Sequence, residues 1–265
     1  MFPAVLSQTL AQRKRALVGW CLGVATTTVL IGMLWPMMRD MADLNALLEN
    51  YPPELKELFN VDAMGTPDGF VNAEYFSLLG PLLFLVFGIA LGARLPATDE
   101  EQGALDVLLS TPLTRVRLLA EQAGALVTSV VLLGLVQLLS LGLTSATFDM
   151  GIGVGRMAGA SLALVLLGAE FGLLALAVGA FTGRRGWALG VASVLAAASY
   201  LFWVATSFLT WLEPWQWLSP MTHAIGSEPL INGLPTGSSL AMAAVALGAL
   251  LAALPVFDRR DLATA

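Results

Sequence analysis

The sequence has few of the residues that carry chemistry in soluble enzymes. Among its 265 residues there is one cysteine, Cys21, one histidine, His223, and two lysines, Lys14 and Lys56. A single cysteine cannot close an intrachain disulfide, and one histidine without cysteine or histidine neighbours does not make a zinc site. Neither lysine follows a glycine, so the chain lacks the G-x-x-x-x-G-K-[ST] loop that holds the phosphates of ATP. We therefore expect no catalytic, cofactor-binding or metal site here, and any energy must come from another polypeptide.

Charged residues are also scarce. They make up 12% of the chain, against 57% hydrophobic residues, whereas soluble domains are about 25% charged. This composition indicates an integral membrane protein. The net charge is −6, and the thirteen basic residues are spread over many loops. No basic patch results, so we expect no nucleic-acid partner.

Six apolar windows are each long enough to cross the ~30 Å hydrocarbon core of a bilayer. They are residues 17–37, 73–94, 118–147, 157–181, 187–211 and 238–257, with approximate limits. The first window follows a basic cluster, but it is too long for a signal-peptide core and ends without a small-residue cleavage pattern. The sequence thus predicts an all-α integral membrane protein, in which residues 1–265 form one domain with six transmembrane helices.

The basic residues also predict the orientation. Six spans place both termini on one side of the membrane. The residues expected on that side are Arg13, Lys14, Arg15, Arg94, Arg115, Arg117, Arg184, Arg185, Arg259 and Arg260, ten of the thirteen. The opposite side has only Arg39, Lys56 and Arg156. Because basic residues are enriched in cytoplasmic loops, we expect a multi-pass protein of the cell membrane with both termini and residues 95–117 in the cytoplasm.

Three segments outside the spans have helical patterns of their own. Residues 1–15 combine an apolar helical face with a basic cluster, which predicts an N-terminal interfacial helix; a frayed tail is the alternative. Residues 38–72 form an external loop with seven acids, in which Pro52 and Pro53 separate two short helices. Residues 212–237 are rich in tryptophan and proline, which predicts short helical pieces near the outer headgroups.

The segment between spans two and three is the most informative part of the chain. Leu105, Leu108 and Leu109 are spaced i, i+3 and i+4, so a short helix there has one apolar face that fits a groove in a soluble partner. Gly103 allows close backbone approach, and Pro112 ends the helix before the third span.

Charges surround this apolar face. Four acids would face the partner: Asp99, Glu100, Glu101 and Asp106. Two basic residues, Arg115 and Arg117, would remain near lipid phosphates. An ordinary surface helix that stabilises the ends of the two spans is the alternative to a docking helix.

Residues 95–117 closely resemble the cytoplasmic coupling segment of ABC-2-type transporter permeases. The matching residues are Glu101, Gly103, Ala104, Leu105, Asp106, Leu108, Leu109, Ser110, Pro112, Thr114 and Arg115. The six spans, the large first external loop and the ending Phe257 to Leu262 extend the resemblance over essentially the whole chain. The resemblance implies that Glu101, Gly103, Leu105, Asp106, Leu108, Leu109, Pro112 and Arg115 couple the chain to an ATPase subunit.

The same resemblance implies a function. The chain would be the permease subunit of an ATP-driven exporter that forms the path for a hydrophobic or amphipathic substrate, such as a drug, antibiotic, lipid or peptide. Its expected partners are membrane lipid, a second permease copy or paralogue, and two copies of an ATP-binding cassette subunit. ATP and Mg would be bound by that subunit and not by this chain.

Glu170 lies near the middle of the fourth span, where an acid is costly unless it faces protein or water. It could contact substrate or a proton on the translocation path, or it could make a structural hydrogen bond. A proton-coupled secondary transporter that uses Glu170 is therefore an alternative function, and a membrane scaffold subunit is another. The sequence shows neither paired half-repeats nor several intramembrane charges, which secondary transporters typically have.

Three G-x-x-x-G spacings lie in or beside the spans. They are Gly88 to Gly92, Gly168 to Gly172 and Gly186 to Gly190. Such spacings can mark close helix packing, but with 26 glycines several arise by chance. They carry little weight in the prediction.

Overall fold

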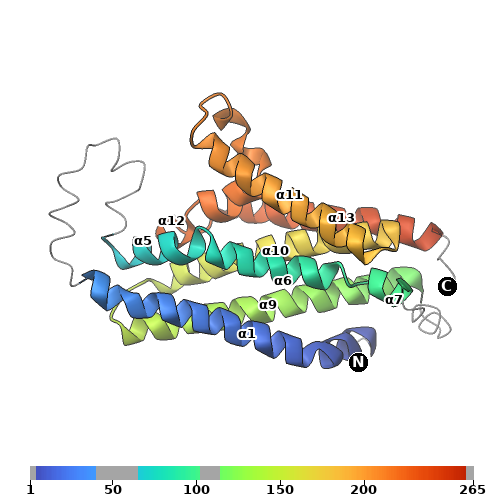
Figure 1. The fold of residues 1–265 in the computed structure, drawn as a ribbon, viewed down its shortest axis with the longest axis horizontal. Helices are drawn as coiled ribbons and strands as arrows, with labels where there is room; N and C mark the ends of the chain where they lie inside the picture. The colour runs from blue at the N-terminus through green and yellow to red at the C-terminus, as the bar shows by residue number, and fades with distance from the viewer. Residues whose placement is uncertain (1–3, 40–64, 102–113, 261–265) are drawn as a thin grey trace.

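The computed structural model describes residues 4–39, 65–101 and 114–260, and this part of the chain is helical without strands (Figure 1). The longer helices are α1 (Ala4–Arg39), α6 (Leu79–Gly92), α9 (Arg115–Thr147), α10 (Val154–Thr182), α11 (Arg185–Thr206) and α13 (Thr236–Arg259). The shorter helices are α5 (Pro67–Val71), α7 (Ala97–Glu101) and α12 (Pro229–Asn232). A π-helix, η1 (Asn72–Phe76), a 3₁₀-helix, η2 (Glu213–Leu218), and a second π-helix, η3 (Thr222–Gly226), connect them.

Six stretches of the described residues are long and apolar enough to cross a membrane. They are Ala11–Arg39, Pro67–Gly92, Arg115–Thr147, Val154–Thr182, Arg185–Thr206 and Thr236–Arg259. The prediction of an all-α multi-pass membrane protein with six transmembrane helices is therefore confirmed. The second stretch is not one regular helix, because η1 joins α5 to α6.

Helix α10 is the centre of the bundle. It packs against α6, α9, α11 and α13, and it is the most enclosed of the six. Helix α1 lies at the edge and packs mainly on α9 (Figure 1). The start of α1, the end of α13 and α7 lie at one end of the bundle, which we call the terminal end (Figure 1). Helices α5 and α12 lie toward the other end, which we call the distal end (Figure 1).

Helices α6 and α10 approach each other through glycine. A Cβ atom built on Gly88 would lie 2.1 Å from the carbonyl oxygen of Gly168, and one on Gly92 would lie 2.0 Å from that of Gly172. Both distances are far below van der Waals contact, and the obstacle is backbone. Two of the three G-x-x-x-G spacings are thus a packing interface, contrary to the little weight that the sequence prediction gave them.

The segments predicted outside the spans have mixed outcomes. Residues 4–15 are the first turns of the single helix α1 and not a separate helix; an interfacial position for them stays a prediction. In the predicted external loop, α5 begins after Thr66, whose side chain accepts a hydrogen bond from the Gly69 backbone N–H. The rest of that loop, including Pro52 and Pro53, lies outside the described residues.

Candidate functional site

The predicted coupling segment is held at both of its described ends. At its beginning, the Oε1 atom of Glu101 accepts a hydrogen bond from the backbone N–H of Arg185, at the start of α11, over 2.8 Å. At its end, the Nη1 atom of Arg115, the first residue of α9, donates to the carbonyl oxygen of Arg260 over 2.6 Å. Two of the predicted site residues are thus fastened to different helices at the terminal end. The other six, Gly103, Leu105, Asp106, Leu108, Leu109 and Pro112, lie outside the described residues.

Glu100 points into the protein and not toward a partner. Its side chain is 5% exposed and forms an ion pair with Arg260, which follows α13. The predicted role of Glu100 as an acid offered to a partner is therefore wrong, because its charge is already satisfied inside the chain. Arg115 donates to carbonyl oxygens at the end of α13, and Arg117 pairs with Glu121 over 2.9 Å. Their predicted position near lipid phosphates stays a prediction.

Gly183 makes room for the ion pair. It ends α10 with φ of +66°, a conformation that residues with side chains rarely adopt. A Cβ atom there would come within 2.6 Å of Arg260 Nη1 and 2.7 Å of Glu100 Oε1. One small cluster, which we call the terminal clamp (Glu100, Glu101, Arg115, Gly183 and Arg260), therefore joins α7, α9, the α10–α11 turn and the end of α13.

Removing one partner of the Glu100–Arg260 pair should destabilise the protein. We expect Glu100→Gln to lower the free energy of unfolding by about 3 kcal/mol. This value is toward the lower end for buried ion pairs, because 20% of the Arg260 side chain is exposed. Glu100→Gln/Arg260→Gln should recover part of this loss, because neither side chain then carries a buried charge. Thermal unfolding in detergent measures both effects.

The control is Lys14→Gln, which removes the charge of an exposed side chain. It should cost less than about 1 kcal/mol. Equal losses in Glu100→Gln and Lys14→Gln would show that the buried ion pair contributes no more than an exposed charge.

A groove runs between α6 and α11. Its cavity of ≈ 360 Å³ is almost entirely apolar, with Pro81, Leu85 and Ile89 on the α6 side and Ala197 and Tyr200 on the α11 side. None of its lining residues carries a charge. Such a space suits the apolar part of a small molecule.

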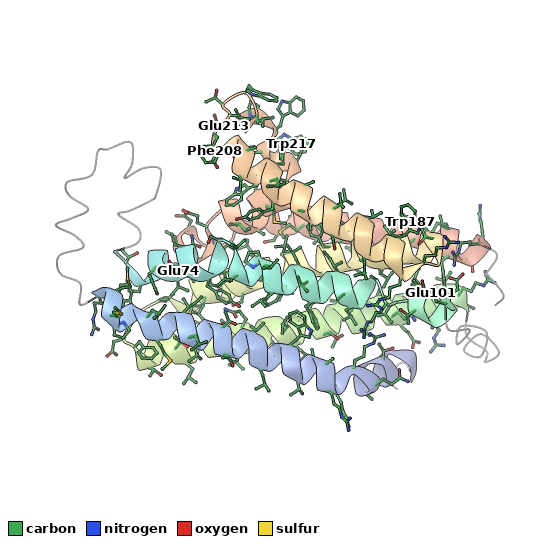
Figure 2. The ribbon with its side chains drawn as sticks, in the orientation of Figure 1. Glu74, Glu101, Trp187, Phe208, Glu213 and Trp217 are labelled. Carbon is green, nitrogen blue, oxygen red and sulfur yellow. The ribbon has the colours of Figure 1, made fainter. Side chains whose placement is uncertain are left out.

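A polar cavity lies near the distal end of the groove. This second cavity has a volume of ≈ 470 Å³ and is lined by residues such as Asn72, Thr210 and Glu213. The two spaces adjoin where the ring of Tyr200, which lines the first, contacts the ring of Trp203, which lines the second, at 5.7 Å. Glu213 lies at the tip of the segment that follows α11, away from Glu101 at the terminal end (Figure 2). The apolar groove and the polar cavity therefore lie on either side of one aromatic contact.

Glu170 lines neither of these two cavities. It lies in α10 at 1% exposure, and its Oε2 atom has no hydrogen-bond partner among the described residues. Among the described residues, this oxygen atom makes no structural hydrogen bond of the kind predicted, and Glu170 does not line the groove. A buried carboxyl oxygen without a hydrogen-bond partner destabilises the fold. Glu170 therefore lowers the stability of the protein unless a group outside the described residues binds this oxygen.

A buried polar cluster was missed by the sequence reasoning. Gln137, in α9, has no exposed surface, and its Oε1 atom accepts hydrogen bonds from Tyr75 over 2.6 Å and Thr28 over 2.8 Å. The three residues join η1, α1 and α9. The sequence signal that could have predicted this cluster is Gln137 itself, a polar residue within the apolar window of residues 118–147. Among the described residues, no group of three or more histidine, cysteine, aspartate or glutamate side chains could hold a metal ion.

One protein-family model matches residues 6–258, nearly the whole chain. It is described as multidrug efflux system permease Rv1217c, C-terminal domain. No curated protein matches the sequence. The matched residues include five of the six apolar stretches in full, the sixth up to its last residue but one, and the predicted coupling segment.

Proposed function

The chain belongs to this family of multidrug efflux permeases, and from that membership we propose that it is the permease subunit of an ATP-driven exporter of the ABC-2 type. The single observation that carries the proposal is the terminal clamp. Glu100, Glu101 and Arg115 belong to the predicted coupling segment and are fastened to α11 and to the end of α13. A displacement of residues 102–113 would therefore be transmitted directly to α11 and α13.

Through this connection, a conformational change in a separate ATPase subunit would be transmitted to the transmembrane helices. That subunit binds ATP and Mg, and its closure would move the coupling segment. Because Glu101 binds the first backbone N–H of α11, the segment moves the terminal end of α11. α11 is one wall of the apolar groove and α6 is the other, so movement of α11 relative to α6 changes the width of the groove.

The substrate in this proposal is a hydrophobic or amphipathic compound. The groove offers apolar contact without charge, and the adjoining distal cavity offers hydroxyl, amide and carboxyl groups. A molecule would leave the apolar groove for the polar cavity and then for water. With both termini in the cytoplasm, as the basic residues predict, this direction is export.

A second permease, identical or paralogous, completes the proposed assembly. α1, α11 and α13 present large apolar side chains on their outer faces, for example Leu22, Val194, Leu201 and Leu251, each more than 60% exposed. Lipid or a second subunit can cover such faces.

Transport into inside-out vesicles tests the proposal against the proton-coupled alternative. Vesicles that contain the chain and a co-expressed ATPase subunit should accumulate a hydrophobic fluorescent dye when ATP is added, and an uncoupler should leave most of the uptake intact. Uptake that needs no ATPase subunit and stops with the uncoupler would overturn the proposal.

Glu170 provides the matching variant. Glu170→Gln keeps the size of the side chain but cannot titrate, so ATP-driven uptake should stay at half of wild type or more, whereas a proton-coupled transporter would lose it. Glu170→Leu should fold at least as stably as wild type, because it removes an oxygen atom that has no partner in the described chain. If Glu170→Leu unfolds the protein while Glu170→Gln leaves folding and dye uptake unchanged, the carboxyl group has a polar partner outside the described residues.

A further inference from the structure

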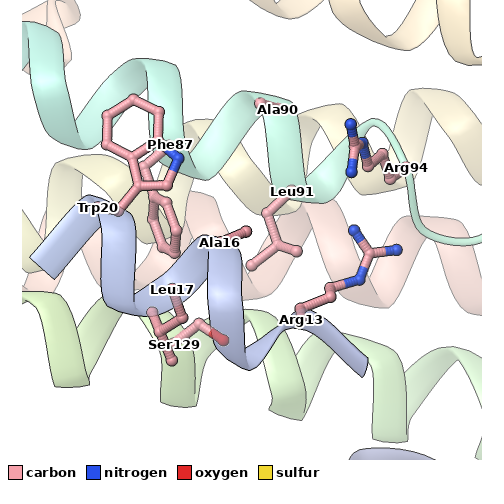
Figure 3. A pocket seen from close by; sticks show the side chains of 9 residues that line it. All are labelled: Arg13, Ala16, Leu17, Trp20, Phe87, Ala90, Leu91, Arg94 and Ser129. Atoms are coloured by element: carbon pink, nitrogen blue, oxygen red, sulfur yellow. The ribbon is translucent and has the colours of Figure 1, made fainter. Parts of the chain in front are cut away.

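A cavity between α1 and α6 lies apart from the α6–α11 groove and is not used in the proposed mechanism. It has a volume of ≈ 160 Å³, and its walls come from α1, from α6 with Arg94 just beyond it, and from Ser129 of α9 (Figure 3). α1 packs mainly on α9 and touches α6 only slightly. A crevice therefore remains along the seam between α1 and α6.

The two ends of this cavity differ in chemistry. Arg13 and Arg94 lie at one end, with both guanidinium groups on the same side (Figure 3). Trp20 and Phe87 lie at the other end, in edge-to-face contact at 5.6 Å between ring centroids. Leu91 lies between the two ends (Figure 3). The site is thus cationic at one end and apolar along the rest.

The position of the cavity sets the orientation of a lipid. Arg13 lies near the start of α1 and Arg94 just after the end of α6, so the cationic end faces the terminal end of the bundle. Lys14 and Arg15, both exposed, are at the same level of α1. A phospholipid of the leaflet on that side presents its phosphate to this level and its acyl chains to the level of Trp20 and Phe87.

We propose that this cavity binds an anionic phospholipid of the leaflet at the terminal end. Arginine binds phosphate with two parallel hydrogen bonds, and both Arg13 and Arg94 line this cavity. Basic pockets between transmembrane helices bind anionic headgroups in this way. The phosphate lies between Arg13 and Arg94, and the first acyl carbons lie along Leu91 and Trp20.

The size of the cavity fits a part of the lipid. A cavity of ~150 Å³ holds a molecule such as benzene, so ≈ 160 Å³ accommodates a few methylene groups. Ala16, at the rim, is exposed, so the rest of the chain continues into the bilayer. The lipid joins α1 to α6 where the protein itself makes little contact.

Native mass spectrometry of the purified protein tests the site, with phosphatidylglycerol, phosphatidylcholine and inorganic phosphate as three separate probes. Wild type should bind one phosphatidylglycerol strongly and phosphatidylcholine at least tenfold more weakly. Arg13→Gln/Arg94→Gln should weaken phosphatidylglycerol binding about tenfold or more. The control Lys14→Gln/Arg15→Gln removes the same charge from residues that do not line the cavity, and it should change binding less than twofold.

Ala90→Phe separates a lipid from a free anion. It fills the apolar part of the cavity and keeps both arginines, so it should abolish phosphatidylglycerol binding if an acyl chain enters the site. Unchanged lipid binding in Ala90→Phe would overturn the proposal. Equal losses of lipid binding in Arg13→Gln/Arg94→Gln and in Lys14→Gln/Arg15→Gln would also overturn it, as would full competition of inorganic phosphate with the lipid. If the arginine double variant does not fold, Arg94→Gln and Ala90→Phe decide the question.

Discussion

Gly88→Ala/Gly92→Ala is expected to prevent the helix bundle from assembling. The two added methyl groups would lie 2.1 Å and 2.0 Å from the carbonyl oxygens of Gly168 and Gly172. These oxygens belong to the backbone of α10, so no side-chain rotation can relieve the overlap, and α6 must move away. α10 contacts four other transmembrane helices, and separation from α6 disturbs the centre of the fold. The cost should exceed the ~1–3 kcal/mol that is typical of overpacking.

The yield of folded protein after extraction from membranes measures this effect, together with the melting temperature of what remains. Gly186→Ala/Gly190→Ala is the matched control, because it has the same spacing on α11 and no described residue from another element lies within 4 Å of either added methyl group. The control should keep wild-type yield. Equal behaviour of the two double variants would show that the α6–α10 contact is not close-packed in the membrane.

These glycines illustrate what the sequence could and could not predict. The number and type of the spans follow from long apolar windows, a local property, and the structure confirms them. The three G-x-x-x-G spacings are alike as sequence, yet two lie in a tight interface and the third has no close contact with another described element. Which helix face meets which neighbour depends on the whole arrangement, so spacing alone does not distinguish them.

The candidate site shows the same division. Glu100 and Glu101 are adjacent acids, but one is buried against Arg260, 160 residues away, and the other binds the Arg185 backbone N–H. The hydrogen bond between Thr28 and Gln137 spans 109 residues. Periodicity identifies an apolar face, but it contains no information about polar partners that the fold brings together from distant parts of the chain. The apolar face at Leu105, Leu108 and Leu109 therefore remains a prediction from spacing.

Leu105→Asp/Leu109→Asp is expected to abolish both transport and the complex with the ATPase subunit. In a helix the two leucines lie on one face with Leu108, and the proposed function requires that face to enter an apolar groove of the partner. Two carboxylates buried there without cationic partners would cost several kcal/mol, on the order of a hundredfold or more in affinity. Co-purification of a tagged ATPase subunit with the permease measures the loss, and dye uptake into vesicles measures its consequence.

The matched control is Val107→Asp/Ser110→Asp, which adds the same two charges. Residues at these positions lie roughly opposite Leu105 and Leu109 on a helix, so the apolar face stays intact and the complex should be retained at near wild-type yield. Both variants should keep the melting temperature of the isolated permease, because the terminal clamp that fastens the segment to α11 and α13 is unchanged. If the leucine variant still co-purifies with the ATPase subunit, or if the two variants lose it equally, then residues 102–113 do not dock through this face. The route from the ATPase to α11 must then begin elsewhere.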